Sequence, residues 1–153
     1  MMCCSASHDR VPAIRCVTLS PEAMHVGLYF RLLVKRNFHG EEVVEFPEYP
    51  TCKVPGEWTV VWDGNNIHGR SKVVKAWLAL RPKVVVEDFP SYDPRNNPDE
   101  WVWSWAKYGK LYNLRPADLE ELVKAVLGAL EELKRQPSLL ASFVLAAEVP
   151  LCL

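Results

Sequence analysis

The sequence describes one small domain of ordinary globular composition. It has 153 residues, of which 49% are apolar and 24% charged, and its formal net charge is −1. A chain of this size and balance can bury a single core. Its composition excludes a membrane-embedded protein, because no apolar run approaches the roughly 18 residues that span a bilayer. The net charge of −1 also argues against a strongly basic nucleic-acid-binding protein.

The cysteines and the N-terminus bear on the compartment. The five cysteines are odd in number and show no C-x-x-C spacing, which favours neither a zinc site nor a complete disulfide framework. The first residues lack the basic-then-apolar order of a secretory signal. We therefore expect a cytoplasmic protein with reduced thiols.

The N-terminal third predicts a leader and two strands. Residues 1–10 carry no periodic signal, so we expect a disordered leader there and an ordered domain over 11–153. Pro12–Leu19 is β-prone, a turn follows, and Val26–Lys35 reads as a second, largely buried strand. The two strands suggest an antiparallel pair.

The middle of the chain alternates helices and strands. Gly40–Tyr49 begins like a helix that its prolines interrupt, and Trp58–Val61 is an apolar strand. Arg70–Leu80 has apolar residues at helical spacing. The continuous valines of Lys83–Phe89 predict a parallel strand covered on both faces.

Helices dominate the C-terminal third. Asn97 and Pro98 have the residue types of a helix start, and an aromatic stripe including Trp105 and Tyr108 follows. Pro116–Arg135 carries an apolar residue at i, i+3, i+4 and i+7, and Ser138–Ala147 reads as a last short helix. The order of elements indicates an α/β layer with a helical C-terminal end.

Two acidic motifs stand at the ends of predicted strands. Asp63 follows the strand over Trp58–Val61, in the run Trp-Asp-Gly-Asn-Asn-Ile-His. Glu100 lies where the next strand has passed into a helix, in Phe-Pro-Ser-Tyr-Asp-Pro-Arg-Asn-Asn-Pro-Asp-Glu-Trp-Val-Trp, and 36 residues separate it from Asp63. Two carboxylates that a sheet brings together in this way make a site for hard divalent cations.

Both motifs, in this order and at this separation, resemble those of DDE transposases of the mariner-like superfamily, in the bacterial and archaeal insertion-sequence branch. The matching residues are Trp62, Asp63, Ile67, His68, Phe89, Pro90, Tyr92, Pro94, Asn97, Pro98, Glu100, Val102 and Trp103. The resemblance implies an RNase H-like mixed sheet flanked by helices. It also implies that Asp63 and Glu100 are catalytic ligands of Mg²⁺ (or Mn²⁺) in the cleavage and transfer of DNA strands at transposon ends.

One part of that pattern has no counterpart in the predicted elements. The family's first catalytic Asp lies on a central first strand, and we find no segment that could form this strand. We therefore expect a partial RNase H-like DDE transposase catalytic domain that is inactive alone. The net charge of −1 fits a chain without a sequence-specific DNA-binding portion.

Each candidate residue also has a plainer role. Asp63 could simply form a turn, and Glu100 could complete a capping box with Asn97. The residues that could contact DNA or shape the site are His68, Asn65, Asn66, Lys72, Arg95 and Lys107. Local hydrogen bonding and solvated surface charge are the alternatives for them.

Three functions remain open from the sequence. The chain could be a transposase fragment that a complementary N-terminal half completes, or an inactive remnant. It could also be a repurposed binding or regulatory module that pairs with full-length transposase. In that case an exposed edge left by the absent first strand would be the place of pairing.

Overall fold

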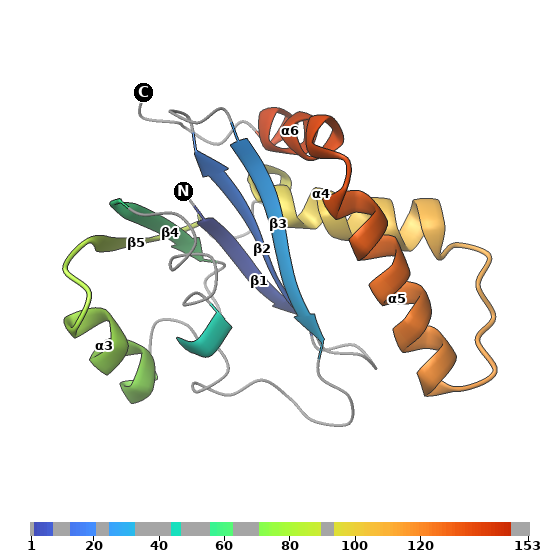
Figure 1. Cartoon of the computed structure of the whole chain (residues 1–153), viewed down its shortest axis with the longest axis horizontal. Coiled ribbons are helices and arrows are strands. Elements are labelled where there is room, and N and C mark those ends of the chain that lie inside the picture. The colour runs from blue at the N-terminus through green and yellow to red at the C-terminus, as the bar shows by residue number, and fades with distance from the viewer. Residues whose placement is uncertain are drawn as a thin grey trace.

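The computed structural model describes residues 2–7, 13–20, 25–32, 44–46, 56–62, 71–89 and 94–147. A five-stranded sheet of order β3-β2-β1-β4-β5 forms its centre (Figure 1). The strands are β1 Met2–Ser7, β2 Ala13–Ser20, β3 His25–Leu32, β4 Trp58–Trp62 and β5 Val84–Asp88. β1 pairs antiparallel with β2 and parallel with β4, so the sheet is mixed.

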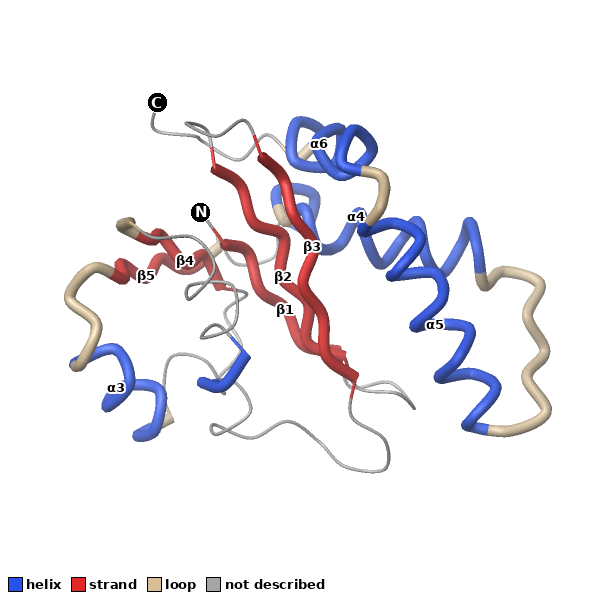
Figure 2. Tube along the Cα trace, in the orientation of Figure 1, coloured by secondary structure: helices blue, strands red, loops and turns tan. Residues whose placement is uncertain are grey.

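Helices cover both faces of this sheet (Figure 2). The helical elements are α3 Lys72–Ala79, the 3₁₀ turn η1 Pro94–Asn96, α4 Pro98–Ser104, the π-helical segment η2 Trp105–Lys110, α5 Leu119–Lys134 and α6 Pro137–Ala146. Neighbouring residues on β2 mark the two faces, because successive side chains on a strand point to opposite sides. Cys16 packs in the core beneath α3, and Val17 packs in the larger core beneath α4, α5 and α6.

The prediction that the sheet lacks its first, central strand is wrong. Met2–Ser7 forms β1 between β2 and β4, and its six residues pair with β2 from Met2↔Thr18 to Ser7↔Ala13. The same residues contradict the expected disordered leader over 1–10, as far as 2–7 are concerned. The segment is short and carries small polar residues, so its strand is set by pairing with two neighbours rather than by a pattern of its own.

The prediction that β5 is covered on both faces is also wrong. β5 pairs parallel with β4, as its valines indicated, but it is an edge strand of the sheet that the described residues form. Val84 and Val86 pack toward α3, whereas Val85 on the other face is 55% exposed. A run of valines does not distinguish a central strand from an edge strand with one open face.

The remaining elements agree with their predicted positions. β2, β3, β4, α3, α4 and α6 all overlap the expected segments, and residues 44–46 are helical. α5 begins three residues after Pro116 because Asp118 caps it, with its side chain accepting a hydrogen bond from the Glu121 N–H at 2.8 Å. Among the described residues, no helix is both long enough and apolar enough to cross a membrane.

Candidate functional site

The site is built around the first turn of α4. Asn97 is the N-cap, and its side-chain oxygen accepts a hydrogen bond from the Asp99 N–H at 3.0 Å. Pro98 follows at the first helical position, where a missing N–H costs nothing. This confirms the predicted start of the helix. α4 then crosses β1 and β2, which it contacts directly.

A buried ion pair fastens this turn to the sheet. The Arg15 guanidinium on β2 donates from Nε to both Asp99 oxygens at 3.1 Å and from Nη2 to Oδ2 at 2.8 Å. The side chains are 1% and 0% exposed. Arg15 also lies over the Trp103 ring, 4.9 Å from its centroid, so two residues of one helix enclose the guanidinium.

The strand register shows where this pair lies in the sheet. Arg15 is opposite Ser5 on the central strand β1. On its other side β1 runs parallel to β4, with Cys4 level with Trp62, the last residue of β4. Ser5, the next residue of β1, therefore has Arg15 as its neighbour on β2 and lies just beyond the level at which β4 ends. This is the part of the sheet where the sequence predicts a metal site.

The ion pair with Arg15 compensates the negative charge of Asp99 in this part of the sheet. Both oxygens of Asp99 are already engaged by a cation, and a buried carboxylate in such a pair keeps its partner because separating them leaves an uncompensated charge. The negative charge of Asp99 is therefore compensated by Arg15. The central strand reads Met-Cys-Cys-Ser-Ala-Ser and contributes no carboxylate.

The predicted metal ligands are only partly within the described residues. Glu100 lies partly buried in the first turn of α4, directly after Asp99, and its N–H donates to the Asn97 carbonyl at 3.0 Å. Asp63, Asn65, Asn66 and His68 lie outside the described residues. The distance between Asp63 and Glu100, and the roles of these residues, stay predictions.

The predicted basic residues do not form one surface. Lys72 begins α3, on the opposite side of the sheet from α4. Arg95 is exposed on η1, where its carbonyl accepts a hydrogen bond from Trp101 Nε1 at 3.1 Å. Lys107 is exposed on η2 beside Tyr108, with its Nζ 5.5 Å from the ring centroid. A contact of any of them with DNA stays a prediction.

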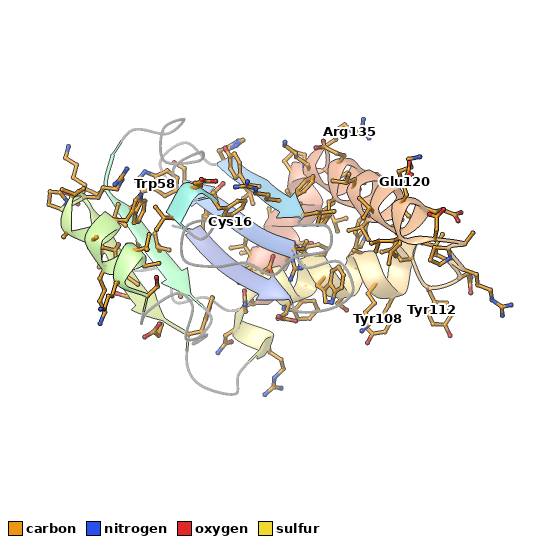
Figure 3. The ribbon with its side chains drawn as sticks, turned by 90° about the horizontal axis from the view of Figure 1, so that it is seen from below. Cys16, Trp58, Tyr108, Tyr112, Glu120 and Arg135 are labelled. Carbon is orange, nitrogen blue, oxygen red and sulfur yellow. The ribbon has the colours of Figure 1, made fainter. Side chains whose placement is uncertain are left out.

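The aromatic stripe of this helix divides into a buried and an exposed part. Trp105 packs against the larger core, as an amphipathic helix predicts. Tyr108 and Tyr112 are 63% and 73% exposed and point away from the helices (Figure 3). The π-helical turns of η2 contribute to this division, because they shift the stripe away from the 3.6-residue repeat.

The described part of the chain offers few ligands for a divalent ion. Mg²⁺ prefers several oxygen ligands in octahedral geometry, and paired-metal sites rest on clustered carboxylates. Within the described ranges no group of three His, Cys, Asp or Glu side chains is placed to hold a metal ion. Asp99, the fully buried carboxylate of the first turn of α4, is bound to Arg15. These residues do not fit the ion that the family resemblance implies.

The sequence motifs single out neither Arg15 nor Asp99. The two residues are 84 positions apart, and no local pattern connects them. A signal was nevertheless present in the β-prone run Ala-Ile-Arg-Cys-Val. An arginine inside such an apolar strand requires a buried partner, because a lone buried charge is too costly.

Two hollows lie beside β3, which is an edge strand of the described sheet. One, of about 390 Å³, is lined by residues 25–29 with Lys134 and Pro137. The other, of about 360 Å³, is lined by Tyr29–Arg31 with Glu45, Phe46, Glu131 and Lys134. Tyr29 and Lys134 line both, so the hollows adjoin along the strand.

The sheet order and the crossing of α4 define the class of fold, which is that of RNase H-like integrase and transposase domains. A chain of the simian T-cell lymphotropic virus intasome in complex with PP2A regulatory subunit B56 gamma superposes with a TM-score of 0.53 at 12% identity, over 84% of this chain and 46% of that one. A chain of the Mos1 strand transfer complex gives 0.52 at 14% identity, over 92% and 44%.

This chain thus spans less than half the length of the solved chains that it resembles. At such identities the likeness concerns the fold alone. No protein-family model matches the sequence. No curated protein matches it either.

Proposed function

We propose that this chain is a catalytic-domain fragment of a mariner-like DDE transposase that does not cleave DNA by itself. The fold is that of integrase and transposase domains, and the two sequence motifs fall at the end of β4 and the start of α4. These are the positions in which the family resemblance assigns Asp63 and Glu100 to metal-dependent DNA cleavage and transfer.

The central strand β1 is the observation that supports the proposed lack of DNA cleavage. β1 occupies the place of the family's first strand, yet it carries no acid. In the active family members, Mg²⁺ or Mn²⁺ held by three acids supplies the charge stabilisation for phosphodiester cleavage. Of the three acids that the resemblance assigns to the ion, two would remain, Asp63 and Glu100, which are too few for a paired-metal site.

The position of β1 also bears on the idea of a split transposase. A complementary N-terminal half would have to supply the central strand, but the chain's own residues 2–7 already pair there with both β2 and β4. Such a half could enter only by displacing β1. We therefore favour an incomplete site over a site that a second chain completes.

A nicking assay tests the proposal. The purified chain is incubated with supercoiled plasmid and Mn²⁺, beside the variants Glu100→Gln and Ser5→Asp. We expect the wild type and Glu100→Gln to nick at the same background rate. Nicking by the wild type that Glu100→Gln abolishes would show an active site and overturn the proposal. Ser5→Asp restores an acid to β1, and a gain of nicking there would place the first acid at this residue.

A repurposed binding module is the second candidate, and the hollows beside β3 favour it. The edge expected from an absent first strand does not exist, because β1 fills that place. The edges of the described sheet are β3 and β5. An edge strand with an adjoining hollow can accept an extended segment of a partner.

Co-purification with full-length transposase tests this second function. Tyr29→Glu changes a residue that lines both hollows, and Val85→Glu is a matched control on the opposite edge strand. If β3 is the docking place, only Tyr29→Glu should abolish co-purification. Equal loss in both variants, or no association of the wild type, would exclude this function.

A further inference from the structure

We propose that β5 is a docking edge for a second copy of this chain, whose own β5 pairs with it antiparallel across a two-fold axis. β5 is an edge strand of the sheet that the described residues form, and β4 is its one neighbour there. A two-fold interface brings the same segment of both copies together, so the segment must be complementary to itself. This inference is independent of DNA cleavage.

The backbone of β5 has groups directed outward for such pairing. The Trp58 N–H donates to the Lys83 carbonyl at 2.9 Å, so the amide groups of Lys83 and of every second residue after it are directed toward β4. Those of Val84 and Val86 are directed away from β4. The Val84 N–H is engaged within its own chain, because it donates to the Arg81 carbonyl at 3.0 Å. The Val84 carbonyl and both amide groups of Val86 lie at the outer edge.

The open face of β5 has a self-complementary order of side chains. Val84 and Val86 pack toward α3, whereas Lys83, Val85 and Glu87 alternate with them on the other face and are all exposed. Along the chain this face reads cation, apolar, anion. When two such strands run antiparallel with Val85 opposite Val85, Lys83 of each copy lies opposite Glu87 of the other. The arrangement covers an apolar side chain that is 55% exposed and forms two ion pairs.

The backbone and the charges favour the same register. It sets Val84 opposite Val86, and the Val86 N–H of each copy can then donate to the Val84 carbonyl of the other. Val85 and the charged residues fall at positions without hydrogen bonds, where facing side chains are closest. If the partner were shifted so that Val86 faced itself, Glu87 would lie opposite Val85 and would face no cation.

The small size of this edge sets the expected strength. Stable and specific interfaces bury more than about 1,000 Å², and one five-residue strand contributes little apolar area. We therefore expect a dimer that depends on concentration, with a dissociation constant on the order of 10–100 μM.

Charge reversal tests the inference by sedimentation equilibrium of the whole chain, over about 5–500 μM to bracket the expected constant. Lys83→Glu and Glu87→Lys each set like charges opposite each other at two symmetric places. Each should raise the dissociation constant about 10-fold or more. The double variant Lys83→Glu/Glu87→Lys restores opposite charges and should dimerise like the wild type. Lys75→Glu, the same change at an exposed residue of α3, is the matched control and should have no effect.

A disulfide tests the position of the axis. Val85→Cys places one thiol of each copy directly opposite the other, at a separation of about 4.5–5.5 Å between Cβ atoms, close to what a disulfide requires. We expect mild oxidation to give a covalent dimer well above the level that the native cysteines give in the wild type. Glu87→Cys is the control, because its two copies would lie about 13 Å apart along the strands.

Several outcomes would overturn the inference. A wild type that stays monomeric over the whole concentration range would do so, as would a dimer that both single charge variants leave intact. A double variant that does not dimerise, or equal cross-linking through Val85→Cys and Glu87→Cys, would also contradict this pairing. None of these readouts depends on plasmid nicking, so a failure here and a failure of the proposed function are separate results.

Discussion

The Arg15–Asp99 pair makes a quantitative prediction about stability. Asp99→Asn keeps the shape of the side chain but removes the charge that compensates a guanidinium with 1% exposure. Breaking a buried pair by changing one partner costs about 3–5 kcal/mol, because the other charge stays buried. For a chain of this length we therefore expect the Tm to fall by about 6–20 °C.

The magnitude follows from the burial of the pair rather than from its distances. The Glu120–Lys124 pair on α5 is just as short, at 2.8 Å, but its side chains are 77% and 72% exposed. For Glu120→Gln we expect a loss of only about 0.3–0.5 kcal/mol, the usual value of an exposed i,i+4 pair. This variant is the matched control for the loss of a negative charge.

Urea unfolding followed by circular dichroism measures the loss of unfolding free energy in Asp99→Asn and in Glu120→Gln. An unchanged m-value would indicate that the unfolded states are comparable. A third variant, Arg15→Met/Asp99→Leu, replaces the whole pair by apolar side chains. We expect it to recover most of the loss, since apolar replacements of buried pairs are often neutral or stabilising. A cost of Asp99→Asn below about 1 kcal/mol would refute this account of the pair.

Two further variants test the caps and the sheet. Asn97→Ala removes the cap bond to the Asp99 N–H, and we expect a loss of about 1 kcal/mol in urea unfolding, with Asn97→Ser close to the wild type. Gly27→Ala would place a Cβ 2.8 Å from the Thr18 hydroxyl oxygen on the neighbouring strand. We expect it to destabilise by about 1 kcal/mol or more, and Thr18→Ala in the same chain to relieve that loss; a stabilising Gly27→Ala would contradict the described packing.

Much of the fold could be predicted because its signals are local. The helix start at Asn97 rests on two adjacent residues, and α5 rests on a repeat of apolar residues along 16 positions. β1 could not be predicted in this way. Its strand depends on β2 and β4, and Val60 is 58 positions beyond its partner Met2.

The candidate site was harder to predict from the sequence than the fold, because it depends on contacts between residues that are far apart in the chain. The motifs locate Glu100 at the start of α4, and the structure agrees with that position. The partner of its neighbour Asp99 comes from β2, and the register that brings Arg15 beside β1 is a property of the whole sheet. A sequence motif names the residues of a site but does not report which charges the tertiary structure places next to them.

The central position of β1 has a consequence for the order in which the chain folds. During synthesis β2 and β3 follow β1 closely, so that β2 can pair with β1 and β3 with β2, whereas β4 is made only after the intervening residues. At about 5–20 residues per second, the 26 positions from Leu32 at the end of β3 to Trp58 at the start of β4 correspond to roughly 1–5 s on the ribosome. Throughout that interval the parallel-pairing edge of β1 in the nascent three-stranded sheet is open, and an open strand edge can mispair with another chain before the domain is complete.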